Sequence, residues 1–218
     1  MKPLPYGDIR TVSATEAQVL ERVTALHLEL LGFGPLASFG PRTVLEFGYR
    51  LPMKSGHLQL AVYEAAGTIG GFIAITTNPD ALYRQSVLRH LPRLAALMVG
   101  SLLESPRRLR DVARALRIWL ARTPAPEGGM AGLGEVAAIA VRPEYADIQF
   151  VRRHRFRVSE ALLDHAIETL RSQGFARMRG LLDADNPAPQ LLYGRRGARF
   201  RTFSQAGIPM VEATIDLR

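Results

Sequence analysis

Residues 135–174 constrain the fold of this chain more than any other stretch of its sequence. The apolar run "EVAAIAVR" (135–142) is typical of a buried β-strand. Residues 159–174 follow a helical period, and Gly174 is the type of residue that commonly ends a helix. The apolar positions of this expected helix are Leu162, Leu163, Ala166, Ile167 and Leu170. A buried strand that leads into an amphipathic helix predicts an α/β protein in which the helix packs on a sheet.

The connection between this strand and this helix is strongly basic. Residues 142–157 contain five arginines and no glycine. The first N–H groups of a helix have no partner within the helix, and the helix dipole favours negative charge at that end. The junction therefore indicates a site for an anion such as a phosphate.

The other expected elements indicate a single mixed α/β domain over residues 1–218. A strand at 8–13 precedes a helix for which Thr15 is the expected cap, and two strand-like runs around "AAG" predict a hairpin at 58–77. A strand at 176–185, a short helix at 186–197 and a terminal hairpin complete the order. Residues 80–122 read as two or more helices inserted before the strand at 135–142.

Composition narrows the class of protein further. The chain has no cysteine, which excludes disulfides, thiolate metal sites and a cysteine nucleophile, and no zinc-ligand spacing points to a metal. The first residues carry no apolar run typical of a signal peptide, and the apolar stretch 94–103 is about half the length of a membrane span. We therefore expect a soluble, cytoplasmic protein. The formal charge of +8 favours anionic partners.

Four short motifs follow one another in the order found in a known family. They are "IAVRPEY" (139–145), "ALL" (161–163), Asp183 with Asn186, and Leu192-Tyr193 with Gly197. On these motifs the chain resembles the GNAT superfamily of N-acyltransferases. The resemblance implies a mixed, mostly antiparallel central sheet flanked by helices. It also implies that a pantetheine thioester, either acyl-coenzyme A or an acyl-phosphopantetheine on a carrier protein, lies beside the strand that ends at Val141.

The basic junction departs from the pattern of that family. The family places glycines in the turn that surrounds the diphosphate of coenzyme A, whereas Arg157 and Ser159 stand at the corresponding positions here. Three interpretations stay open: arginines replace the glycine cradle, the donor is an acidic acyl carrier protein that brings only one phosphate, or the site is inactive. The residues that the resemblance assigns to the donor are Ile139, Ala140, Val141, Arg152, Arg153, Arg155, Arg157, Val158, Ser159 and Asn186.

Two residues are candidates for catalysis through the same resemblance. Tyr193 matches the tyrosine that protonates the leaving sulfur, and its alternative is a packing role. Glu135 matches the carboxylate that deprotonates the amine, and its alternative is a solvated charge at the start of a strand. His57, His90, His154 and His165 are further candidates for the base, although His165 fits a partly buried structural position better. Asn186 precedes a proline and is equally suited to cap a helix.

The reaction predicted from these features is acyl transfer from a pantetheine thioester to a primary amine of a small molecule or peptide. Apolar residues within 80–122 suggest a wall for a medium or long acyl chain. A plain acetyl-coenzyme A-dependent acetyltransferase and a non-catalytic module that binds acyl thioesters or carrier proteins are the alternatives. A nucleic-acid binder is disfavoured because exposed aromatic residues are not interleaved with the basic ones. The sequence leaves the acceptor amine and the oligomeric state open.

Overall fold

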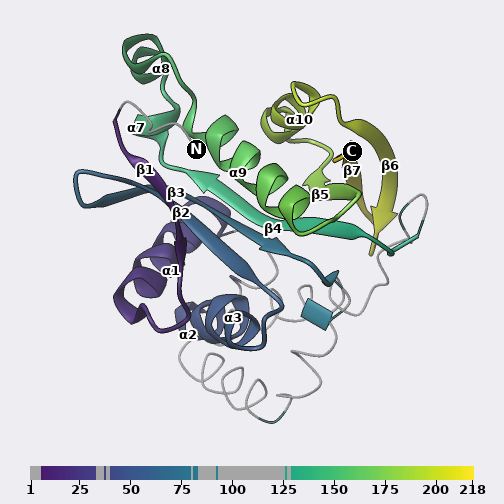
Figure 1. Cartoon of the computed structure of the whole chain (residues 1–218), viewed down its shortest axis with the longest axis horizontal. Helices are drawn as coiled ribbons and strands as arrows, with labels where there is room; N and C mark the ends of the chain where they lie inside the picture. Colours follow the sequence, from purple (N-terminus) through teal and green to yellow (C-terminus); the bar gives the residue numbers. More distant parts are fainter. Residues whose placement is uncertain are drawn as a thin grey trace.

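A computed structural model describes residues 6–32, 40–79 and 129–218, together with the single residues 37, 81, 82, 92 and 126. Its centre is a seven-stranded, mostly antiparallel sheet in the order β1-β2-β3-β4-β5-β7-β6 (Figure 1). The strands are β1 (Asp8–Val12), β2 (Gln59–Ala65), β3 (Thr68–Thr76), β4 (Leu133–Val141), β5 (Arg177–Asp183), β6 (Arg199–Gln205) and β7 (Ile208–Asp216). The fold class predicted from the sequence is confirmed.

Helices cover both faces of this sheet (Figure 1). The described helices are α1 (Ala17–Leu31), α2 (Pro41–Thr43), the π-helix η2 (Val44–Arg50), α3 (Leu51–Lys54), α7 (Pro143–Ala146), α8 (Ile148–His154), α9 (Val158–Ser172) and α10 (Pro187–Gly194). Alternate residues of each strand point to opposite faces. Tyr63 of β2 accordingly joins the apolar core under α9, whereas its neighbour Val62 joins a second core under α1.

Two local predictions hold in detail. The residues predicted to form the apolar face of the helix at 159–174 are buried in α9, and Gly174 follows the helix with φ +81°. The hairpin at 58–77 is formed by β2 and β3, with Ala66 at φ 48° and Gly67 at φ 75° in its turn. Two successive positive φ values define a two-residue turn whose twist matches that of the strands.

Other local predictions are wrong. Thr15 does not cap α1, because Glu16 stands at the cap position and no side chain bonds the free N–H groups there. The segment between β4 and α9 was expected to be a loop but contains α7 and α8, which Asp147 separates by capping α8 through the Gln149 N–H. The predicted helical insertion at 80–122 lies almost entirely outside the described residues.

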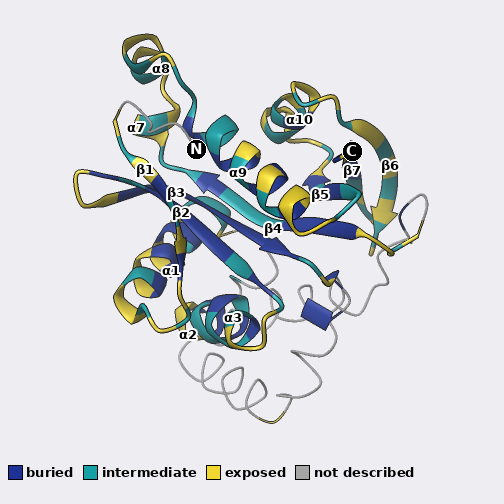
Figure 2. Cartoon of the chain, viewed as in Figure 1, coloured by how far each residue is buried: buried dark blue, intermediate teal, exposed yellow. Residues whose placement is uncertain are grey.

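Strands β4 and β5 pair for only part of their length, and this feature positions the candidate site. They run parallel and pair from Leu133–Val136 to Arg177–Gly180. The register between β3 and β4 shifts at Ala137, which is an extra residue on β4 opposite β3. Such a bulge bends a strand and increases its local twist. The two strands diverge beyond it, and β4 changes from buried to half-buried although it is the central strand (Figure 2).

Candidate active site

We use the name opening for the region beyond Val136 of β4 and Gly180 of β5, where the two strands no longer pair; a buried tyrosine on α10 lies beside Gly180. The ring of Tyr193 is fully buried, and its hydroxyl faces Gly180 of β5. A Cβ atom at Gly180 would lie 2.4 Å from the hydroxyl oxygen, so only glycine leaves room for the phenol. Within the described residues this hydroxyl has no hydrogen-bond partner. Burial, and then the negative charge of Glu135, raise the pKa of Tyr193, so the phenol keeps its proton and is a potential donor.

Glu135 lies on the other face of the sheet at the same level. A Cβ at the preceding Gly134 would strike Leu170 of α9, so Glu135 points away from α9. Its carboxylate is buried and accepts a 2.6 Å hydrogen bond from Arg179. The alternative that Glu135 is a solvated charge at the start of the strand is therefore wrong. Its assignment as the base stays a prediction.

Arg179 connects Glu135 to a larger buried ionic network. It lies 3.5 Å from Glu212, whose other oxygen lies 2.5 Å from Arg201. Arg179, Glu135 and Glu212 are each less than 5% exposed. Opposite charges held this close offset part of each other's cost of burial. The network fixes the Glu135 carboxylate on the face of the sheet opposite Tyr193.

The arginines of the basic junction do not gather at the start of α9. Arg152 and Arg153 are exposed on α8, and Arg155 is exposed in a left-handed conformation that ends this helix. Arg157 is half-buried at the cap position of α9 and lies 3.4 Å from Glu160. Their predicted contacts with a donor phosphate stay predictions.

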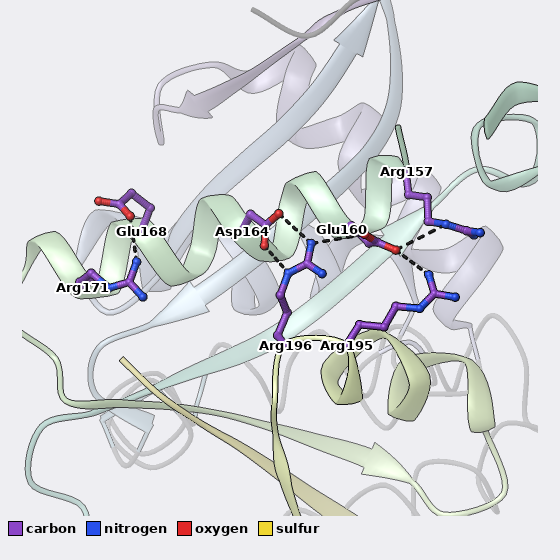
Figure 3. A network of polar contacts seen from close by, with 7 residues as sticks. All are labelled: Arg157, Glu160, Asp164, Glu168, Arg171, Arg195 and Arg196. Atoms are coloured by element: carbon purple, nitrogen blue, oxygen red, sulfur yellow. Dashed lines mark hydrogen bonds and ion pairs between the residues drawn. The ribbon is translucent and has the colours of Figure 1, made fainter. Parts of the chain in front are cut away.

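The first turns of α9 carry their own negative charges. Glu160 lies 2.6 Å from Arg195 and 3.4 Å from Arg196, and Asp164 accepts two hydrogen bonds from Arg196 (Figure 3). These pairs tie the end of α10 to α9. The predicted donor-site residues Val158 and Ser159 lie in the same turn, the first buried and the second half-buried.

The remaining predicted donor residues lie along the opening. Ile139, Ala140 and Val141 follow the bulge of β4, where the described residues of β5 provide no pairing partner. Asn186 is exposed and accepts a hydrogen bond from the Ala188 N–H, so its expected capping role is confirmed. Its contact with pantetheine stays a prediction.

Of the histidines considered from the sequence, two pack as structural residues. His165 is half-buried on α9 as expected, and burial lowers its pKa. The ring of His154 lies 4.5 Å from the ring centres of Tyr6 and Phe150. His57 is half-buried, whereas His90 lies outside the described residues.

Sequence reasoning missed a buried histidine–tyrosine pair. His27 of α1 and Tyr49 of η2 share a 2.7 Å hydrogen bond between Nδ1 and the hydroxyl, next to Phe72. Burial lowers the pKa of His27 to about 4 and raises that of Tyr49. The sequence could have indicated that His27 is buried, because it follows Val23 by four residues and so lies on the apolar face of the helix.

Within the described part of the chain, the opening offers polar groups without a partner, whereas the start of α9 lacks the glycine turn expected around a diphosphate. The polar groups are the buried hydroxyl of Tyr193 and the edge of β4 beyond Val136, which pairs with β3 but not with β5. The start of α9 lacks glycine and holds the Glu160 carboxylate, which opposes a second anion.

The described residues contain no group of three or more potential metal ligands, and none of their helices is long and apolar enough to span a membrane.

The order of strands, the bulge and the diverging pair define the GNAT fold. The structure is similar to an N-acetyltransferase from Staphylococcus aureus Mu50, with a TM-score of 0.57 and 12% identity over 97% of this chain and 99% of the other. It is also similar to the PaiA N-acetyltransferase from Thermoplasma acidophilum in complex with coenzyme A (TM-score 0.56, 12% identity, 96% and 98% of the two chains). A third similar structure is the ribosomal-protein-S18-alanine N-acetyltransferase from Escherichia coli (TM-score 0.52, 14% identity, 96% and 94%). No protein-family model and no curated protein matches the sequence.

Proposed function

We propose that this protein is an N-acyltransferase that transfers an acyl group from a pantetheine thioester to a primary amine. The observation that carries the proposal is the buried, unpartnered hydroxyl of Tyr193 at the point where β4 and β5 diverge. The GNAT fold, which solved N-acetyltransferases share, supports the same reaction.

The reaction forms one C–N bond and breaks one C–S bond. The amine nitrogen attacks the thioester carbonyl, and the backbone N–H groups of Ile139 and Val141 on β4, which face away from β3, stabilise the resulting oxyanion. The amine loses a proton to a base, and the thiolate takes one up to leave as a free thiol. Tyr193 is the source of that proton: its O–H donates to the departing sulfur as the C–S bond breaks, and the phenol regains a proton from solvent while the base releases the one taken from the amine. Burial raises the pKa of Tyr193, so the phenol holds this proton until the sulfur leaves.

The carboxylate of Glu135 is the proposed acceptor of the amine proton. It lies on the opposite face of the sheet from Tyr193. This arrangement is required if the acyl thioester and the amine approach the reacting carbon from different sides of the sheet. Its carboxylate is buried against Arg179, so we propose that a water molecule relays the proton to it. An uncharged amine is the reactive form of the acceptor.

The acyl group is proposed to be a medium or long chain, because the sequence of residues 80–122 is rich in apolar side chains. An acetyl group is the second candidate, because the similar solved structures are described as N-acetyltransferases. Turnover of acetyl, decanoyl and palmitoyl thioesters with one amine separates these two. If acetyl thioester gives by far the highest kcat/KM, the long-chain proposal is wrong.

Replacement of Tyr193 with Phe tests the function itself. Removal of an unpartnered buried hydroxyl leaves stability unchanged or slightly higher, so the variant is expected to fold normally. Loss of a donor to the leaving group is expected to reduce kcat by about 10²-fold or more. If the protein is instead a non-catalytic binding module, the wild type and the variant should bind acyl thioesters equally well, and neither should show turnover. If the Tyr193→Phe variant has the same kcat as the wild type, the proposed role of Tyr193 is wrong.

A further inference from the structure

A short arm near the candidate site carries exposed arginines that pair with no carboxylate among the described residues. We use the name α7–α8 arm for residues 143–157, which connect β4 to α9. In Figure 1 the arm projects beyond the edge of the sheet, and α8 lies at its outer end. The arm follows directly after Val141, so it borders the entrance to the opening between β4 and β5.

Aromatic contacts hold this arm in a defined place. The ring of Phe150 on α8 lies 5.3 Å from that of Tyr145 on α7 and 5.6 Å from that of Phe156 before α9. Tyr145 and Phe156 in turn contact Tyr63 of β2, at 5.7 and 5.9 Å. Edge-to-face pairs at these distances are favourable packing contacts. The arm therefore presents its outer residues on a fixed surface.

That outer surface is cationic. Arg152, Arg153 and Arg155 are exposed, and among the described residues none of them forms an ion pair or a side-chain hydrogen bond. Ile148, at the start of the same helix, is 52% exposed. Arginine beside an exposed apolar residue is the composition found at protein interfaces rather than at small-anion sites.

The described arginines closer to α9 are already paired with carboxylates. Arg157, Arg195 and Arg196 each contact a carboxylate of α9 (Figure 3). A diphosphate bound at the start of this helix would have to displace Glu160 from those partners. Of the arginines that the structure describes near the candidate site, those free for an anionic donor therefore lie on α8 and at its end. A partner that binds them must be large enough to cover a helix face and still reach the opening.

We propose that the outer face of α8 docks an acidic acyl carrier protein, which delivers its phosphopantetheine thioester into the opening between β4 and β5. This inference rests on the proposed function, because it takes the donor to be a pantetheine thioester. Negative side chains of the carrier pair with Arg152, Arg153 and Arg155, and an apolar residue of the carrier packs on Ile148. Complementary charge of this kind steers association and fixes orientation.

Charge reversal on the arm tests the docking surface. The test variant is Arg152→Glu/Arg153→Glu, and its matched control is Arg42→Glu/Arg218→Glu. The control makes the same change in net charge at two exposed arginines outside the arm. The probe is the acidic acyl carrier protein of bacterial fatty-acid synthesis in its phosphopantetheine form, titrated by isothermal calorimetry at low and at moderate salt. We expect Kd to rise by about tenfold or more in the arm variant, and by less than about twofold in the control.

Three results would overturn the proposal. They are a wild-type protein that does not bind the carrier, an arm variant with unchanged Kd, and a control that loses as much affinity as the arm variant. The same proteins are titrated with anionic vesicles and with a short RNA duplex. If vesicles or RNA bind the wild type but not the arm variant, and the carrier protein binds neither, the surface belongs to another class of partner. That result overturns the proposal as well.

Turnover of a small acyl-pantetheine separates this inference from the proposed function. This donor lacks both the carrier and its phosphate, so its turnover by the wild-type protein reports on the catalytic step without the contacts proposed for the arm. Normal turnover together with arm-independent carrier binding refutes the docking surface alone. Arm-dependent carrier binding without turnover of any thioester supports the docking surface and refutes the proposed catalysis.

Discussion

The buried pair His27 and Tyr49 makes folding stability sensitive to mild acid. The pKa of His27 is lowered to about 4 in the folded protein, whereas an unfolded histidine titrates near 6.5. Between these two values the unfolded chain binds a proton that the folded chain does not. Stability is therefore unaffected above about pH 7, falls as pH drops through 6.5, and has lost the full contribution near pH 4.

The magnitude follows from the two pKa values. At pH 5 the unfolded imidazole is almost fully protonated and the folded one is mostly neutral. Lowering the pH from 7 to 5 is expected to reduce the free energy of unfolding by about 2 kcal/mol through His27 alone. Burial of His165 lowers its pKa in the same direction and adds to the wild-type slope. Carboxylates contribute little over this range, because most of their titration lies below pH 5.

Urea unfolding at pH 7 and pH 5 measures this effect in the wild type and in His27→Gln. Glutamine keeps a hydrogen-bonding group near Tyr49 but has no proton to gain, so the variant is expected to lose about 2 kcal/mol less than the wild type between the two pH values. Titration of the His27 ring by NMR provides an independent value of its pKa. Equal pH dependence in the two proteins, or a ring that titrates near 6.5, would refute the reasoning.

Three further substitutions test the packing around the candidate site. Arg179→Met leaves two buried carboxylates without their common partner and is expected to cost about 3–5 kcal/mol in urea unfolding; the loss should exceed that of Arg201→Met, because Arg201 is one-third exposed. Gly180→Ala forces a methyl group into the hydroxyl of Tyr193 and is expected to cost about 1–3 kcal/mol in thermal unfolding, so a variant as stable as wild type would contradict this contact. Glu160→Gln releases arginines at the start of α9 and is expected to tighten the binding of coenzyme A several-fold, as measured by calorimetry. The cost in the free energy of unfolding should be less than about 1 kcal/mol. An unchanged affinity would mean that those arginines do not reach the phosphates.

Elements with strong local signals were predictable from the sequence. The apolar face of α9 repeats at helical spacing, and Ala66-Gly67 separates two strand-like runs by a two-residue turn. The motifs from Ile139 to Gly197 predicted the fold because they fall at the ends of strands and helices, where the backbone path restricts residue choice. These features depend on neighbours within a few residues.

The contacts of the candidate site depend on residues far apart in the sequence. Glu135 meets Arg179 44 residues later, so no local pattern predicted that the carboxylate is buried and paired. The extra residue Ala137 in β4 is visible only against its partner strand β3. The short helix α8 replaced an expected loop because the basic sequence gave no apolar period long enough to indicate a helix.

The limited pairing between β4 and β5 also affects how the molecule unfolds. Strands β1 to β4 form one antiparallel unit, and β5, β7 and β6 form another. Four residue pairs, the buried contact between Glu135 and Arg179, and the apolar core under α9 join the two units. A ligand lodged between them adds contacts to both, so it should raise amide hydrogen-exchange protection in both units together. Substrate binding would thereby make two loosely coupled half-sheets behave as one cooperative unit.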